Sequence, residues 1–204
     1  TQTRESEDRR PYSLGIDLGQ RVAIVLLDDR LKVRGHKCYE WTIDSFPGYD
    51  HPIQWTRRLA ADWVRWLWDA CLDDECMCFR HYATLADTIC AESIWLHAAP
   101  HRGRHIQPEG VLIIGEMATE LSNLLGTIGK RLTLVNPADL GRVIPKRRRI
   151  SAMSNGLLGD WQDTDWHTEY GGPRGGSGVR QDVADAAMLA YWGMTRHGAR
   201  ALQV

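Results

Sequence analysis

Three apolar segments joined by short turns open the chain, and they constrain its fold more than any other feature. The segments span 12–18, 21–28 and 31–41. Asp28-Asp29-Arg30 has the composition of a tight turn. Strands that follow one another this closely pair as antiparallel neighbours. The sequence therefore predicts a sheet that begins with three antiparallel strands, after a flexible tail at residues 1–11.

The remainder of the chain alternates between helical and strand patterns. The predicted elements are a helix at 53–70, a strand at 110–116, a helix at 119–129, a strand at 131–135, a helix that starts at Asn136-Pro137, and a last helix at 181–197. Strands separated by helices run parallel in one sheet. We therefore expect an α/β fold, a mixed sheet flanked by helices, in a single domain over 12–204. The Trp residues of the first helix fit its core face, with base stacking as the alternative.

Two segments lie outside this simple order. Residues 71–109 are predicted to be a helical insertion, because 82–98 has helical periodicity. Cys76, Cys78, His81 and Cys90 are candidate zinc ligands within it, although no paired C-x-x-C units occur and buried cysteines are the alternative. Residues 156–180 contain a Gly-rich run and are predicted to be a flexible loop.

Acidic residues occur where apolar segments end. Asp17 ends the first predicted strand between Gly15 and Gly19, and Glu116 ends the strand predicted at 110–116. Asp182 and Asp185 are spaced i, i+3, so they share one face at the start of the last helix. Carboxylates at the edge of a core are costly unless they share a cation, and oxygen-only ligands favour Mg²⁺ or Mn²⁺.

The four carboxylates predict phosphodiester hydrolysis if they converge. Two metal ions about 4 Å apart activate the attacking water and stabilise the leaving oxygen. We expect Asp17 to bridge two such ions. The alternative is that these are four unrelated surface acids.

A basic run indicates a nucleic-acid partner despite a formal net charge of −1. Its members fall within eight positions and are Arg142, Lys146, Arg147, Arg148 and Arg149. Such a run attracts a phosphate backbone, and the alternative is a solvated surface loop. There is no transmembrane span or signal peptide, and five cysteines are an odd number, so a cytoplasmic protein with reduced thiols and no membrane partner is expected.

The motifs resemble the RuvC family of Holliday junction resolvases, within the RNase H-like nuclease superfamily. The matching stretches are Gly15-Ile-Asp-Leu-Gly19, Ile114-Gly-Glu116, Val135-Asn-Pro137 and Asp182-Val-Ala-Asp-Ala-Ala-Met-Leu-Ala190. The order of the predicted elements also matches. The resemblance implies an RNase H-like fold, a homodimer that cuts four-way DNA junctions with Mg²⁺, and metal binding by Asp17, Glu116, Asp182 and Asp185.

Two other functions are compatible with parts of the pattern. Another RNase H-like nuclease, such as a terminase nuclease domain that cuts linear duplex DNA, would have a similar acidic set. Gly-Ile-Asp-Leu-Gly is also shared by sugar kinases and actin-like ATPases, but that fold needs two related domains and a second phosphate loop. Cleavage of four-way junctions in preference to linear duplex would favour the resolvase.

Overall fold

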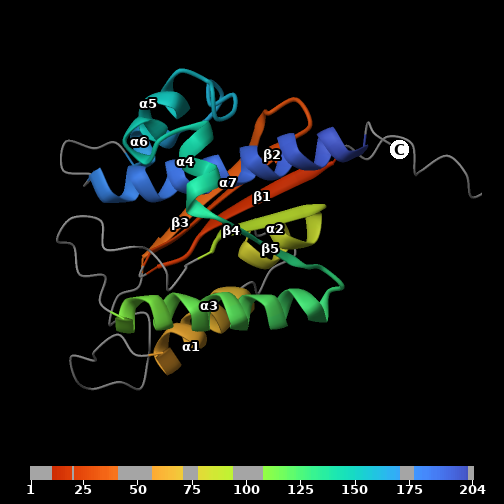
Figure 1. The fold of residues 1–204 in the computed structure, drawn as a ribbon, viewed down its shortest axis with the longest axis vertical. Helices are drawn as coiled ribbons and strands as arrows, with labels where there is room; N and C mark the ends of the chain where they lie inside the picture. The colour runs from red at the N-terminus through yellow and green to blue at the C-terminus, as the bar shows by residue number, and fades with distance from the viewer. Residues whose placement is uncertain are drawn as a thin grey trace, which may run out of the picture.

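A computed structural model describes residues 11–19, 21–40, 57–70, 78–93, 108–170 and 177–201. They form one five-stranded sheet flanked by helices (Figure 1). The strands are β1 (Tyr12–Asp17), β2 (Arg21–Asp28), β3 (Val33–Glu40), β4 (Thr88–Glu92) and β5 (Leu132–Val135). Their order is β3-β2-β1-β4-β5, antiparallel from β3 to β1 and parallel from β1 to β5. The predicted mixed sheet, and its opening with three antiparallel strands, are confirmed.

The helices cover both faces of this sheet. They are α1 (Arg57–Asp69), α2 (Phe79–Leu85), α3 (Pro108–Thr127), α4 (Pro137–Val143), the 3-10 helix η2 (Lys146–Arg148), α5 (Arg149–Ser154), α6 (Trp166–Tyr170) and α7 (Ser177–Ala201). Helix α7 crosses one face, while α1 and α3 lie on the other (Figure 1). None of the helices in the described ranges is long and apolar enough to cross a bilayer.

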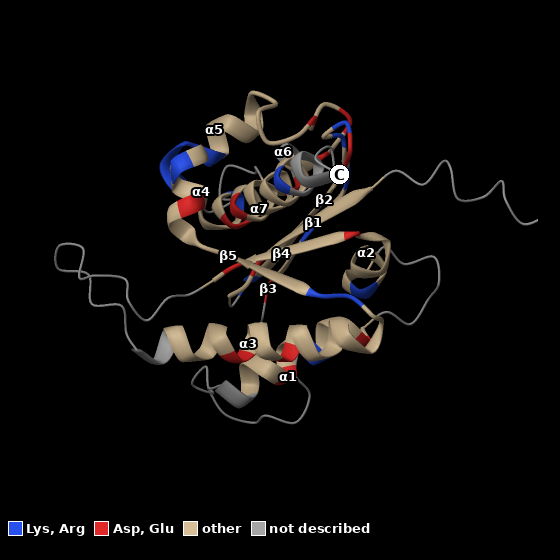
Figure 2. Ribbon diagram, turned by 45° about the vertical axis from the view of Figure 1, so that its right-hand side comes forward, with Lys and Arg blue, Asp and Glu red and all other residues tan. Residues whose placement is uncertain are grey.

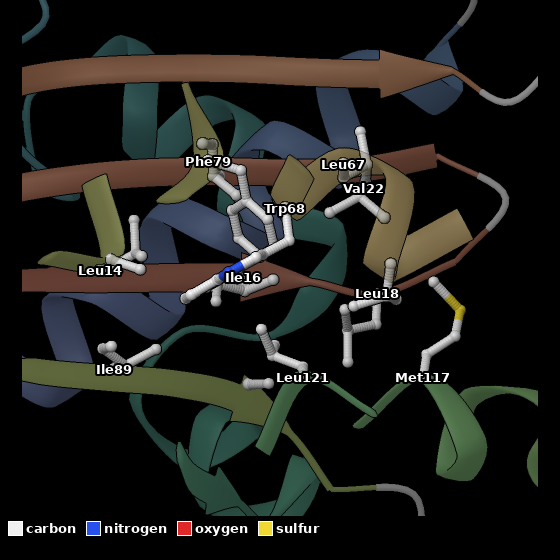
Figure 3. Packing of buried hydrophobic residues seen from close by; sticks show 14 of the residues in the cluster. Leu14, Ile16, Leu18, Val22, Leu67, Trp68, Phe79, Ile89, Met117 and Leu121 are labelled. Carbon is white, nitrogen blue, oxygen red and sulfur yellow. The ribbon is translucent and has the colours of Figure 1, made fainter. Parts of the chain in front are cut away.

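Alternating side chains of β1 divide the core into two layers. Leu14 and Ile16 point toward α1 and α3, where they pack with Trp68, Phe79 and other apolar residues (Figure 3). Gly15 and Asp17 therefore face the α7 side. Trp63 of α1 is buried, which confirms its predicted core position.

Helix α7 lies unusually close to β1. A Cβ atom placed on Gly15 would stand 1.9 Å from the Ala186 carbonyl oxygen. The small residues Ala186, Ala187 and Ala190 of α7 are all fully buried. Because neither element has a large side chain at this crossing, α7 packs closely on β1. The acidic residues of α7 therefore lie beside the end of β1.

Two predicted elements were assigned to the wrong type. Residues 110–116 belong to helix α3, although they were expected to form a strand. The segment assigned to a helical insertion contains β4, which lies between β1 and β5 in the sheet. A central strand has no polar face and so shows no alternation, which hid β4. The run of β-branched residues at the start of α3 resembles a strand when only six or seven residues are considered.

The segment predicted as a flexible loop is partly ordered. Trp161 and Trp166 are buried in the core layer beneath α7, and Trp161 Nε1 donates to the Leu158 carbonyl at 3.1 Å. Within 156–180 the prediction is therefore wrong for residues 156–170 and for residues 177–180, which begin α7. Residues 171–176 lie outside the described residues, as do 1–10 of the predicted tail.

Candidate metal centre

Two carboxylates lie at the carboxyl ends of adjacent parallel strands. Ile16 of β1 pairs with Ala91 of β4, so Asp17 and Glu92 are the next residues of their strands. Both face the α7 side, because Ile16 and Ala91 belong to the opposite core layer. The sheet therefore brings Asp17 and Glu92 together at one edge.

Helix α7 adds two more carboxylates from the neighbouring layer. Asp185 is fully buried and the side chain of Asp182 is 22% exposed. The negative charges of Asp185 and Asp182 act on Asp17, and the charge of Asp185 also acts on Glu92. Asp17, Glu92, Asp182 and Asp185 form one group, which we call the acidic cluster.

The acidic cluster perturbs its own protonation. Burial raises the pKa of Asp17 well above its ordinary value, and repulsion from Asp185, Asp182 and Glu92 raises it further. Burial also raises the pKa of Glu92. The Asp17 carboxylate forms no hydrogen bond or ion pair with any described residue. This carboxylate lacks a direct cationic partner within the described part of the chain.

Two basic side chains reach the acidic cluster from the segment before α7. Arg149 is 3% exposed, and its Nη1 donates to Asp185 Oδ1 at 2.7 Å and lies 4.0 Å from Glu92 Oε2. Lys146 Nζ lies 2.7 Å from Asp185 Oδ2. The two atoms form an ion pair, but their geometry does not meet that of a hydrogen bond. Asp185 Oδ2 is therefore buried without a hydrogen-bond donor. Asp185 is thus held by charge on both sides.

The other α7 carboxylate is held from β2. Arg21 Nε donates to Asp182 Oδ2 at 2.5 Å. Gln181, one turn before Asp185, donates from Nε2 to Asp185 Oδ1 at 2.8 Å. These contacts fix the orientation of both α7 carboxylates.

Glu116 is not part of this group. It lies on an exposed face of α3, in the layer on the opposite side of the sheet from α7. The acidic residues of α3 can be followed there in Figure 2. The expectation that Glu116 ends a strand beside Asp17 is wrong, because the residue at that place in the sheet is Glu92.

The basic run divides into exposed and buried members. Arg142, Arg147 and Arg148 are exposed, and Arg142 pairs with Asp139 at 3.3 Å. Lys146 has a side chain that is 66% exposed although it reaches Asp185. Arg149 is buried, so it is not available at the surface as predicted. Figure 2 shows Lys and Arg residues gathered between α4 and α5.

No known protein-family model matches the chain, and no curated protein sequence matches it. Among solved structures, Thermus thermophilus RuvC in complex with a Holliday junction substrate aligns over 94% of this chain and 96% of its own, with 12% identity and a TM-score of 0.53. A second structure of Thermus thermophilus RuvC aligns over 93% and 96%, with 11% identity and a TM-score of 0.42.

The chain has the fold of RuvC. At 12% identity the comparison establishes the architecture alone. It agrees with the sheet order and with the RNase H-like class that the motifs predicted.

The donor set of the acidic cluster fits a divalent metal within this RuvC fold. All four side chains offer oxygen, the preferred ligand of Mg²⁺ and Mn²⁺. Among the described residues no three His, Cys, Asp or Glu side chains are oriented to hold an ion together, because Asp182 and Asp185 are turned toward cationic side chains. The Asp17 carboxylate, which has no ion pair with a described residue and a raised pKa, indicates that negative charge remains to be neutralised.

The main residue that sequence reasoning missed is Glu92. Its signal was the short run Thr88-Ile-Cys-Ala-Glu92, in which apolar residues end at an acid as they do at Asp17. Lys146 and Arg149 were identified as basic, but their contact with an acid 36 or more positions away was not deducible from a linear charge run. Of the zinc candidates, Cys90 is a buried free thiol in β4, and Cys76 lies outside the described residues. Cys78, directly before α2, is in a disulfide, so the expectation of reduced thiols is wrong at this residue and Cys78 offers no thiolate to zinc. His81 lies in α2, where its backbone amide donates to Cys78 Sγ at 3.4 Å.

Proposed function

We propose that this chain is a metal-dependent DNA endonuclease that cuts four-way junctions. The observation that carries the proposal is the convergence of Asp17, Glu92 and the α7 pair at one sheet edge, with exposed basic residues beside them. The RuvC fold supports the same reaction class. One of the two Thermus thermophilus RuvC structures holds a Holliday junction substrate, and we extend that substrate class to this chain as part of the proposal.

The acidic cluster would hold Mg²⁺ or Mn²⁺, in two positions, through Asp17, Glu92, Asp182 and Asp185. Bound divalent ions supply an activated water and stabilise the leaving oxygen. Glu92 takes the role that the sequence had assigned to Glu116. Asp17 would share the ions with the other three acids, because the charges of Asp185, Asp182 and Glu92 all act on it.

The basic side chains have separate tasks in this proposal. Arg149 is buried and holds Asp185 in one orientation, so it is a positioning residue. Lys146 is anchored at Asp185 but largely exposed, so it can contact a phosphate that enters the cluster. Arg147 and Arg148 line the approach and bind the backbone without reading sequence.

A four-way junction presents two equivalent strands for cutting, so we propose a homodimer that places one acidic cluster at each. Light scattering of the purified protein measures this directly. A mass of twice 23.2 kDa is expected, and a monomer that cuts junctions at unchanged rate on dilution contradicts it.

The test of the function is a cleavage assay with four substrates: a four-way junction, a flap, a fork and a linear duplex, each with Mg²⁺ or Mn²⁺. The wild-type protein should cut the junction in preference to the others, and Asp17→Asn should bind it without cutting. Preference for linear duplex would favour the terminase-like alternative. The ATP-binding alternative loses support because the described residues form one sheet and not two related domains.

A further inference from the structure

A pocket of about 340 Å³ opens between α3 and β5, next to the carboxyl end of β4. Its lining comes from all three elements. The residues are Glu92, Ser93, Ile114, Gly115, Ala118, Thr119, Ser122, Asn123, Leu132 and Leu134. The volume lies within the range of ordinary small-ligand sites.

The lining combines apolar walls with polar groups. Ile114, Leu132 and Leu134 contribute apolar side chains to its walls. Ser93 Oγ is buried with no hydrogen-bond partner, and Asn123 offers an amide on an exposed turn of α3. Such a surface suits a planar group with an apolar face and a hydrogen-bonding edge.

The charge of the described lining disfavours an anionic occupant. Among the described residues that line the pocket, Glu92 is the only ionisable one and none is Lys or Arg. A phosphate or carboxylate would therefore meet repulsion. The pocket favours a neutral ring. The cationic side chains of Lys146 and Arg149 lie at Asp185, on the α7 side of the sheet.

Glu92 and Ser93 link the pocket to the metal centre. Glu92 belongs to the acidic cluster, and Ser93 follows it as the chain leaves β4. The pocket lies on the α3 face of the sheet and opens at the edge where β4 ends. If a DNA strand places its phosphate at the acidic cluster, a neighbouring nucleotide that turns around this edge would meet the pocket.

We propose that this pocket receives an unstacked nucleobase next to the phosphate that is cut. The inference rests on the proposed nuclease function and adds a subsite for base selection. Enzymes that expose a base hold it between apolar side chains and read its edge by hydrogen bonds. Asn123, on an exposed turn of α3 that lines the pocket, is placed to make such a bond here.

Two glycines of α3 provide a matched pair of variants. Gly115 lines the pocket and Gly126 does not, and an added Cβ meets nothing within 4 Å at either position. Both lie within the same helix, where replacing glycine by leucine raises helix propensity. Gly115→Leu should therefore fill the pocket without unfolding the protein, and Gly126→Leu is the control.

The experiment uses four-way junctions with 2-aminopurine at each position that flanks the cut. Fluorescence is recorded with Ca²⁺ and single-turnover cleavage with Mg²⁺. Wild type and Gly126→Leu should show a several-fold rise in fluorescence at one position, and Gly115→Leu should show none. Gly115→Leu should cut about tenfold or more slowly, because a substrate that is displaced from its reactive position loses at least that much rate. Its affinity for the junction should be nearly unchanged, because phosphate contacts dominate binding.

Four results would overturn the inference. Junction cleavage by wild type without a fluorescence rise at any position removes the base pocket and leaves the nuclease function intact. The same follows if Gly115→Leu and Gly126→Leu give equal fluorescence and equal cleavage rates. It also follows if Gly115→Leu alters only the dimer fraction in light scattering, because that result would assign the pocket to a second copy of the chain. A wild-type protein that cuts no DNA contradicts the nuclease function itself, and the base pocket with it.

Discussion

Asp17 is a carboxylate whose surroundings disfavour its charge. Its pKa is raised by burial and by the neighbouring acids, and its ordinary value applies only in the unfolded chain. Asp17 therefore stabilises the fold most below pH 4, and that contribution is lost as the pH rises through the folded-state pKa. A divalent ion would restore it at neutral pH.

Asp17→Asn should remove this pH dependence. In EDTA the variant and the wild type should have similar free energies of unfolding near pH 4, and the variant should be more stable at pH 8. Each unit of pKa shift corresponds to about 1.4 kcal/mol. Urea unfolding at both pH values measures the difference. Equal stability of the two proteins at pH 8 would mean that the folded protein does not disfavour the charged form of Asp17.

Arg149 and Asp185 form a buried ion pair with a 2.7 Å contact. Arg149→Met leaves Asp185 with Lys146 and Gln181 only, so it should lower the free energy of unfolding by about 3 kcal/mol. Combining it with Asp185→Asn should cost much less than the sum of the single changes. Urea unfolding of the four proteins gives the coupling energy, and strict additivity would show that the pair is not coupled.

At the scale of elements, the crossing of β1 and α7 sets the position of the cluster. Gly15→Ala forces the Ala186 carbonyl away from β1, so α7 must shift and carry Asp182 and Asp185 with it. We expect a loss of about 1–3 kcal/mol in stability, together with weaker metal binding.

Gly141→Ala in α4 is the control for that change, because an added Cβ meets nothing within 4 Å there. It should be neutral or stabilise the protein by up to about 1 kcal/mol. Thermal unfolding compares both variants. A Gly15→Ala protein as stable as the control would show that the close approach is not required.

The 3-10 helix η2 carries Arg147 and Arg148 as exposed residues next to Lys146, which contacts Asp185 of the acidic cluster. Replacing both by Ala should weaken junction binding and reduce the slope of log K against log salt by about 2. Arg30→Ala, in the turn at the opposite end of β1, is the control and should leave the slope unchanged. A double variant with the wild-type slope would leave η2 without a role in DNA binding.

At the scale of the whole molecule, the sequence predicted several elements whose pattern is local. The hairpin strands and the Asn136 cap of α4 depend on neighbours in the chain, and both are present. Helix α7 begins at Ser177 and not at 181, so Asp182 and Asp185 lie beyond its first turn and the expected acidic helix start is wrong. Asn136 Oδ1 accepts from the Ala138 amide at 2.9 Å, as its position before Pro137 indicated.

The errors arose where a short stretch of sequence and the longer stretch around it indicate different secondary structure. The stretch before Glu116 resembles a strand over six residues, but Ile113, Met117, Leu121 and Leu125 are all buried at a spacing of four, which is a helical face. The short strand β4 shows no alternation because both of its faces are covered. These paired errors moved the strand acid from Glu92 to Glu116.

The comparison of those two glutamates is the most direct test of the central claim. Glu92→Gln and Glu116→Gln make the same chemical change on opposite sides of the sheet. Mn²⁺ titration calorimetry and junction cleavage should be measured for both. Glu92→Gln should weaken Mn²⁺ binding and lower the cleavage rate at least about 100-fold, with Glu116→Gln equal to wild type. Normal metal binding and cleavage by Glu92→Gln would contradict the account.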